Sequence, residues 1–219
     1  MSLPGPPTRW ALASAGPGGT GATDGSALPG YAEHLAALVA EGADVDGEAR
    51  LADALVGRGA RVLDVGAGMG RVAAALVARG HDVTAIEPDP ALRAQAAATY
   101  PGLDVLDLDA RAVDAALGSF DLVVCVGNVA VYLAEGTERA VLAALGGVLA
   151  PGGRMLVGYH PVSSRGGARD YADVDFRADV VAAGLAVRGR WGGYDLTPPT
   201  DEYAVWLLAR AGSPTAGRA

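Results

Sequence analysis

The stretch VLDVGAGMG, residues 62–70, joins a short apolar run, one aspartate and glycines at every second position, Gly66, Gly68 and Gly70. A short apolar run is typical of a buried strand, and glycines allow a tight turn whose backbone a ligand can approach closely. The residues that follow, 71–79, are predicted to form a helix. A strand that enters a glycine turn and then a helix points backbone N–H groups at a ligand. The stretch therefore predicts a ligand site at the carboxyl end of a strand.

The alternation of strand and helix continues along most of the chain. Strands are predicted over 61–65, 82–87, 103–107, 120–126, 154–159, 185–191 and 203–209. Helices are predicted over 31–41, 46–56, 71–79, 91–99, 135–149 and 176–183. Several strands are apolar throughout, which predicts an α/β fold with a parallel sheet covered on both faces. No helix fits in the loop 192–202, so the last two strands are expected to pair antiparallel.

The chain of 219 residues is long enough for one domain with its own core. Residues 1–29 are rich in Pro, Gly, Ser and Thr and have no apolar periodicity, so they are predicted to be a flexible tail. Residues 30–210 are predicted to form a single domain that begins with two helices over 30–57. Residues 211–219 are predicted to be a second tail.

Composition excludes several kinds of function. The basic count of 17 is entirely arginine, so neither a pyridoxal phosphate Schiff base nor a Walker-type phosphate loop can be built. The net charge of −8 argues against a nucleic-acid partner, because such binding needs a positive surface. The longest apolar run, 122–134, is interrupted and too short to span a bilayer. With one cysteine and no apolar signal-peptide core near the N-terminus, a cytoplasmic location is expected.

The glycine pattern differs from that of dinucleotide-binding folds. Those folds place G-x-G-x-x-G in this turn, which would put the third glycine at position 71, where this chain has arginine. Asp64 also lies two residues before Gly66. A carboxylate there would repel a pyrophosphate, but it suits a ligand that carries an ammonium group.

VLDVGAGMGRVA resembles the first motif of the class I S-adenosylmethionine-dependent methyltransferases, and the resemblance spans about residues 46–210. Four later stretches match further landmarks of that family in order: VTAIEPDP, VLDLDAR, FDLVVCVGNVAVYL and LGGVLAPGGRMLVGY. The resemblance implies a three-layer αβα sandwich whose seven-stranded, mostly parallel sheet has an antiparallel last strand. It also implies S-adenosyl-L-methionine as the cofactor and in-line displacement of its methyl group as the reaction.

The resemblance further implies how the glycine loop meets the cofactor. Asp64 would hold the amino end of the cofactor, directly or through water. Gly66 and Gly68 would allow the backbone to approach the cofactor, and Gly70 would let strand and helix pack closely.

Two later carboxylates complete the implied cofactor site. Glu87 would accept hydrogen bonds from both ribose hydroxyls. A carboxylate after the third strand would accept from the adenine amino group, and Asp109 is assigned this role with Asp107 as the alternative. The other implied cofactor-binding residues are Ala67, Pro88, Leu108, Ala110, Gly127, Asn128 and Val129.

Candidates for the acceptor side follow the two strands nearest the transferred methyl. Asn128, Tyr159 and His160 are the candidate catalytic residues; their structural alternatives are a turn former, a strand cap and a loop histidine. Tyr31 and His34 lie on the first predicted helix and are candidates for lid or substrate contacts.

The expected reaction needs little from the protein beyond alignment and exclusion of water. The expected acceptor is a small molecule rather than nucleic acid or a membrane. No metal site is predicted, because the histidines lie far apart, and His81 is expected at the surface. O-, N- and C-methylation are not distinguished. Two alternatives are a protein that binds the cofactor without turnover and a nicotinamide-dependent oxidoreductase.

Overall fold

The computed structural model describes residues 5–15, 28–162 and 166–213. Within these ranges, seven strands form one sheet in the order β3-β2-β1-β4-β5-β7-β6. The strands are β1 Arg61–Val65, β2 Asp82–Ile86, β3 Val105–Leu106, β4 Phe120–Cys125, β5 Leu149–Tyr159, β6 Leu185–Trp191 and β7 Ala204–Arg210. Neighbouring strands from β3 to β5 are parallel, whereas β7 lies antiparallel between β5 and β6. The predicted sheet with its antiparallel last strand is confirmed.

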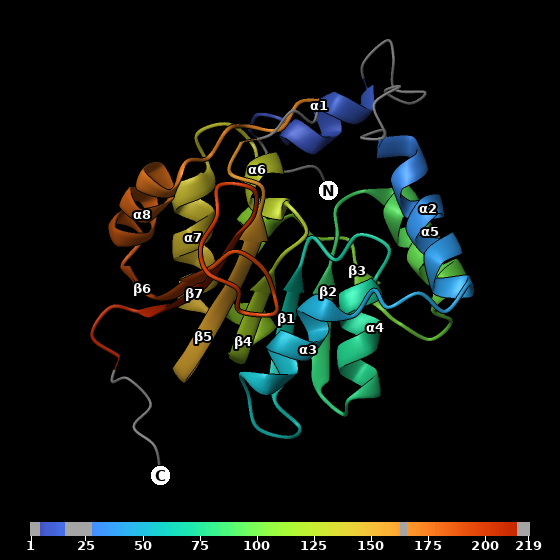
Figure 1. Cartoon of the computed structure of the whole chain (residues 1–219), viewed down its shortest axis with the longest axis horizontal. Helices are drawn as coiled ribbons and strands as arrows, with labels where there is room; N and C mark the ends of the chain where they lie inside the picture. Colours follow the sequence, from blue (N-terminus) through green and yellow to red (C-terminus); the bar gives the residue numbers. More distant parts are fainter. Residues whose placement is uncertain (1–4, 16–27, 163–165, 214–219) are drawn as a thin grey trace.

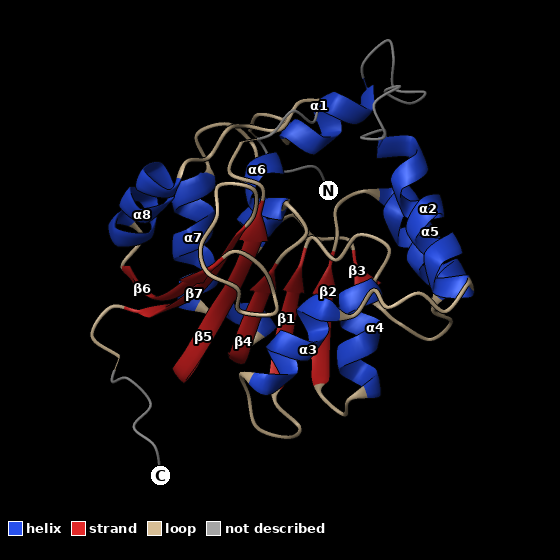
Figure 2. Ribbon diagram, viewed as in Figure 1, coloured by secondary structure: helices blue, strands red, loops and turns tan. Residues whose placement is uncertain are grey.

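Helices cover both faces of this sheet (Figure 1, Figure 2). The helices are α1 Arg9–Ala15, α2 Leu28–Ala40, α3 Gly47–Ala54, α4 Arg71–Ala78, α5 Pro90–Thr99, α6 Val129–Tyr132, α7 Glu138–Gly147 and α8 Asp173–Ala182. Two short 3-10 turns lie at Ala110–Ala112 and Ala115–Leu117. Buried side chains of α3 and α4 pack on one face, and those of α7 and α8 on the other. The result is the three-layer arrangement that the sequence predicts.

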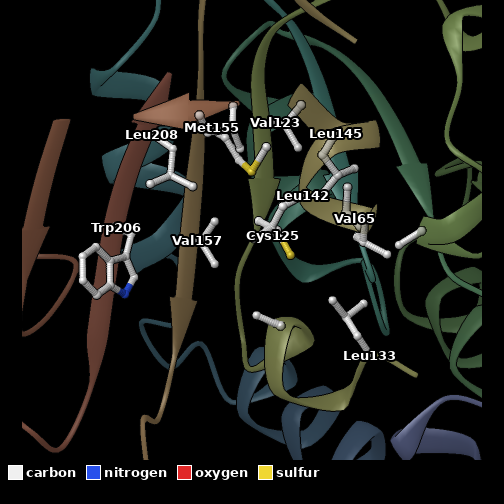
Figure 3. Close-up of a cluster of buried hydrophobic side chains, with 14 of the residues drawn as sticks. Val65, Val123, Cys125, Leu133, Leu142, Leu145, Met155, Val157, Trp206 and Leu208 are labelled. Carbon is white, nitrogen blue, oxygen red and sulfur yellow. The ribbon is translucent and has the colours of Figure 1, made fainter. Parts of the chain in front are cut away.

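The two layers of core follow from the two-residue repeat of a strand. In β1, Val62 faces the α3–α4 layer and Leu63 faces the α7–α8 layer. Figure 3 shows part of the α7–α8 layer, where Cys125, Val157 and Trp206 follow one another across β4, β5 and β7. Burial raises the pKa of the Cys125 thiol to about 12. The lone cysteine therefore packs as an apolar side chain rather than a reactive one.

Element boundaries differ from the prediction at α7 and β5. The helix predicted over 135–149 ends at Gly147, and β5 begins at Leu149 rather than at position 154. Leu149 pairs with Phe120 of β4, and a side chain at Gly153 would lie 2.8 Å from the Phe120 carbonyl oxygen. The close approach of β4, which exists only in the folded sheet, extends the strand toward its N-terminal end.

Helix α1 lies inside the stretch predicted to be a flexible tail, so that prediction is wrong for residues 9–15. The Arg9 guanidinium donates to the Leu133 carbonyl at 2.9 Å and to Glu138 Oε1 at 2.8 Å. Trp10 Nε1 donates to Asp89 Oδ2 at 2.6 Å. These partners lie far along the chain, so no local sequence pattern indicates them. Within the predicted tails, residues 1–4, 16–27 and 214–219 lie outside the described residues.

Glu138 anchors α1, because its buried carboxylate lies 2.8 Å from Arg9 and 2.7 Å from Arg169. We expect Glu138→Ala to leave two guanidinium groups without this partner and to lower the free energy of unfolding by about 3 kcal/mol. Chemical denaturation measures that change, and hydrogen exchange should show faster exchange of the α1 amides. Arg50→Ala, which removes an exposed pair with Asp44, is the control and should leave stability nearly unchanged, because water screens exposed pairs. Unaltered exchange in α1 would contradict the anchoring role.

Candidate active site

A cavity of about 950 Å³, including the open space at its mouth, lies at the carboxyl ends of β1, β2 and β4. Open α/β sheets bind ligands at this edge. The loops after the strands form one side of the cavity, and helices form the other, with α1 above the strand ends in Figure 1. Lining residues from the loops and α4 include Asp64, Gly66, Ala67, Gly68, Met69, Arg71, Glu87, Pro88, Asp109, Ala110 and Gly127. Lining residues from the helical side are Thr8, Trp10, Leu35, Leu92, Val129, Tyr132 and Leu133.

The loop after β1 adopts a conformation that needs glycine. Gly66, Gly68 and Gly70 have φ angles of 66°, 58° and 82°, in the left-handed region that side chains disfavour. A side chain at Gly66 would lie 2.6 Å from Val129 Cγ2, and one at Gly70 would lie 2.5 Å from Leu103 Cδ2. Gly70 thus makes room for Leu103, after α5, rather than for the predicted packing of strand on helix. At Gly68 nothing lies within 4 Å of an added side chain, so the backbone there borders open cavity.

Glu87 follows β2 and holds the glycine loop in place. Its side chain is buried, and Oε2 accepts from the Gly68 N–H at 3.0 Å while Oε1 accepts from the Asp89 N–H at 2.9 Å. Burial raises the pKa of Glu87 to about 7, although these two backbone donors lower it. A carboxylate oxygen can accept more than one hydrogen bond. Glu87 therefore retains acceptor capacity on the cavity wall for a ligand's hydroxyl groups.

Asp64 is the penultimate residue of β1, and only 2 % of its surface is exposed. Its Oδ2 atom is buried and has no hydrogen-bond partner among the described residues. Burial raises the pKa of Asp64 to about 7, although the charge of Arg71 lowers it. Arg71 is itself paired with Glu48 of α3 at 2.5 Å. Because a buried carboxylate oxygen without a donor is costly, this wall fits a ligand that supplies a positively charged donor.

The two acids after β3 lie in different surroundings. Asp109 lines the cavity and pairs with Arg111 through bonds of 2.9 and 2.8 Å. Burial opposes its ionisation, but hydrogen bonds from the Arg111 side chain and backbone outweigh burial and hold the pKa of Asp109 below its usual value. The side chain of Asp107 is 67 % exposed, pairs with Arg93 at 3.1 Å and does not line the cavity. Of the two alternatives, Asp109 is the one at the cavity.

The other predicted cofactor-binding residues also divide into those that line the cavity and those that do not. Ala67, Pro88 and Ala110 line the cavity. Leu108 does not, because its side chain packs against the α7–α8 core. Because adjacent residues in an extended segment point to opposite sides, the Leu108 side chain points away from the cavity that Asp109 lines.

Asn128 joins the ends of β4 and β5. It has a φ angle of 77°, and its N–H donates to the Gly158 carbonyl at 3.0 Å. Its Oδ1 accepts from the His160 backbone N–H at 2.9 Å and lies 2.9 Å from His160 Nδ1. Asn128 therefore forms the turn and also brings the His160 ring to the end of β4. Neither side chain is among the residues that line the cavity, although the residues on both sides of Asn128 are.

Tyr159 does not lie at the cavity, and its prediction as a catalytic residue is wrong. The side chain is fully buried against Tyr171 and Phe176, with ring centroids 5.6 and 5.2 Å away. Tyr159 shares a face of β5 with Val157, and that face belongs to the α7–α8 core. Burial raises the pKa of its hydroxyl. The residue is part of the aromatic core.

The predicted contacts from the N-terminal helix also change. His34 is exposed on α2 and does not line the cavity, whereas its neighbour Leu35 does. The side chain of Tyr31 lies outside the described part of the chain.

His81, expected at the surface, is buried with Nε2 at 2.9 Å from Asp53 Oδ1. The packing of α3 on α4 covers the start of β2, and the sequence around His81 carries no sign of this.

The sequence analysis missed the aromatic part of the cavity wall. Trp10 and Tyr132 lie there with ring centroids 5.4 Å apart and planes at 86°. Trp10 is in a segment, RWALASA, whose alanines and leucine favour a helix, so a local helix signal was present. Nothing local indicates that this helix reaches the cavity.

Within the described ranges, no group of three or more His, Cys, Asp or Glu side chains is placed to hold a metal ion. Among the helices of the same ranges, none has the length and apolar character needed to cross a membrane.

Comparisons with known proteins agree with this geometry. A family model described as a methyltransferase domain matches residues 62–153. An uncharacterized methyltransferase of Mycobacterium tuberculosis is 34 % identical over 145 residues, which cover 64 % of this chain and 70 % of that protein. The crystal structure of a TehB-like SAM-dependent methyltransferase from Corynebacterium glutamicum is 33 % identical with a TM-score of 0.74, and the match covers 83 % of this chain and 97 % of that one.

A more distant structure shows the fold alone. The CcbJ methyltransferase from Streptomyces caelestis is 18 % identical with a TM-score of 0.66, and the match covers 76 % of this chain and 90 % of that one. The glycine loop, the carboxylates at the strand ends and these relatives lead to one conclusion: the chain belongs to the class I S-adenosylmethionine-dependent methyltransferases, a family of enzymes whose cofactor is S-adenosylmethionine.

Proposed function

We propose that this chain transfers the methyl group of S-adenosylmethionine to a small-molecule acceptor inside the cavity. The observation that carries the proposal is Asp64, a residue that lines the cavity and whose buried Oδ2 atom has no hydrogen-bond partner among the described residues. An ammonium group such as that of the cofactor's methionine part would supply the missing donor and the opposite charge.

Each remaining part of the cofactor has a chemically matched residue on the wall. Glu87 has acceptor capacity for the ribose hydroxyls, and the open backbone at Gly68 allows close approach of the ligand. Asp109 remains ionised, because its pKa is held low, and it can accept from the adenine amino group. When bound, the cofactor supplies an electrophilic methyl group. The chain then has to align the acceptor and exclude water.

Asn128 and His160 are proposed to border the acceptor site at the ends of β4 and β5. The contact between His160 Nδ1 and Asn128 Oδ1 favours, for the neutral ring, the tautomer that carries its proton on Nδ1. In that form Nε2 is the basic nitrogen. We assign it the task of receiving the proton that the acceptor loses, with Asn128 as the positioning residue.

Glu87→Ala should weaken S-adenosylmethionine binding by about 10- to 100-fold, because hydrogen bonds to a charged carboxylate are lost. Isothermal titration calorimetry measures the change. Asp107→Asn is the matched control, since this carboxylate is exposed and outside the cavity, and its effect should stay within about twofold. Equal effects of the two substitutions would contradict the assignment of Glu87.

Binding of S-adenosylmethionine should strengthen as pH rises from 6 to 8. Asp64 and Glu87 each have a pKa of about 7 in the free protein, and a bound cation favours their ionised forms and lowers both values. Affinity should increase by up to about tenfold per pH unit for each proton released, and then level off at higher pH. Calorimetry in two buffers of different ionisation heat measures the released protons, and Asp64→Asn should reduce them. An affinity independent of pH would contradict the assignment.

His160→Ala should lower kcat by roughly 10²- to 10⁴-fold while the affinity for S-adenosylmethionine stays unchanged. Asn128→Gly keeps a residue that tolerates positive φ but removes Oδ1, and it should lower kcat and alter its pH profile. His34→Ala, exposed on α2, is the control. The acceptor for these assays comes from a metabolite panel that is scored by S-adenosylhomocysteine release. Full activity of both His160→Ala and Asn128→Gly would remove these two residues from the mechanism.

A further inference from the structure

The helical side of the cavity presents apolar and aromatic side chains. Trp10 and Tyr132 form an edge-to-face pair with centroids 5.4 Å apart, and Leu35 and Leu133 lie on the same side. Among the described lining residues of this side, the one other polar side chain is Thr8, whose Oγ1 accepts from the Ala11 N–H at 3.0 Å at the start of α1. None of these residues is an Asp, Glu, His, Arg or Lys. An aromatic ring can extend such a pair through further edge-to-face or offset contacts.

The arginines near the cavity are all bound to carboxylates. Arg9 pairs with Glu138 at 2.8 Å and Arg71 with Glu48 at 2.5 Å. These two arginines neutralise carboxylates that do not line the cavity.

Two further arginines, which pair with the acids that follow β3, are also bound to carboxylates. Arg93 pairs with Asp107 at 3.1 Å and also donates to the Glu87 carbonyl at 2.7 Å. Arg111 pairs with Asp109 at 2.8 Å and also donates to the Pro6 carbonyl at 2.8 Å. A carboxylate or phosphate on the acceptor would have to displace one of these partners. It would also lie near the lining acids, whose charge repels it.

We propose that the acceptor carries an aromatic ring and no anionic group, and that Trp10 and Tyr132 select it. This inference rests on the proposed methyl transfer and names its substrate class. In the reaction, a nucleophilic oxygen, nitrogen or sulfur on the acceptor forms the new bond to the methyl carbon. The electrons of the broken C–S bond remain on sulfur, and the acceptor loses its proton. The products are the methylated ring compound, S-adenosylhomocysteine and a proton.

Pairs of acceptors that differ by one carboxylate test whether the site excludes anionic groups. Phenol is compared with 4-hydroxybenzoate, and aniline is compared with 4-aminobenzoate. Binding to the full chain saturated with S-adenosylhomocysteine is followed by saturation-transfer NMR, and turnover by S-adenosylhomocysteine release. The uncharged member of each pair should bind roughly tenfold or more tightly than its carboxylate. Equal or tighter binding of the carboxylates would overturn the proposal.

Variants of α1 test the role of the ring. Trp10→Ala should raise KM for the uncharged acceptors by roughly three- to tenfold, a larger factor than its effect on the affinity for S-adenosylmethionine. Leu12→Ala is the control on the same helix, because Leu12 is 57 % exposed. Trp10→Phe keeps a ring but loses the bond to Asp89, and its KM should stay near that of the unmodified chain.

The outcomes separate this inference from the proposed function. An unchanged KM in Trp10→Ala would overturn the selection by Trp10. If Trp10→Phe is as impaired as Trp10→Ala, the anchor to Asp89 rather than the ring determines acceptor binding, and the inference is wrong. If the unmodified chain gives no binding heat with S-adenosylmethionine, the proposed function itself fails.

Discussion

The cavity depends on two carboxylates buried at the edge of an apolar sheet. Glu87 ties the glycine loop to the end of β2 through the Gly68 N–H, and Asp64 faces the same space from β1. Their pKa values of about 7 lie above those of unfolded chains, so the folded protein holds protons that the unfolded chain releases. Their contribution to stability is therefore fully present below about pH 4 and is lost as pH rises through about 7. A cationic ligand offsets this loss, which couples occupancy of the site to stability.

The residues on the sheet side of the cavity were largely predictable from the sequence, because the elements that place them are local. β1 matches the predicted strand residue for residue, and the loop glycines and Glu87 follow directly from the ends of two strands. The choice between Asp107 and Asp109 needed the structure, since both acids follow the same short strand and only one lines the cavity. Tyr159 failed for a related reason: its position at the end of β5 was right, but the strand face on which it lies is buried. Sequence spacing fixes which strand end a residue occupies, but the packed layers decide which way it points.

The helical side of the cavity was not predictable from the sequence, because it is assembled from segments far apart in the chain. Trp10 and Tyr132 meet across more than half of the sequence. Tyr132 lies in the landmark FDLVVCVGNVAVYL, but Trp10 lies outside every family landmark. His160 reaches its position through the Asn128 side chain. The two sides of the cavity therefore differ in origin. In the proposed function, the sheet loops bind the common cofactor, and the peripheral helices form the surface that distinguishes acceptors.

The anchoring of α1 has a consequence for how the molecule is made. Arg9 bonds to Glu138, 129 positions later, and Thr8 forms an isolated bridge with Ala134. A ribosome releases the first of these partners long before the second, so this wall of the cavity closes only after α7 has emerged. Until then the glycine loop can fold on β1 and β2 while one side stays open to water. Removal of residues 1–29, which the composition predicts to be a flexible tail, would also remove α1. This side of the cavity would then stay open to water permanently.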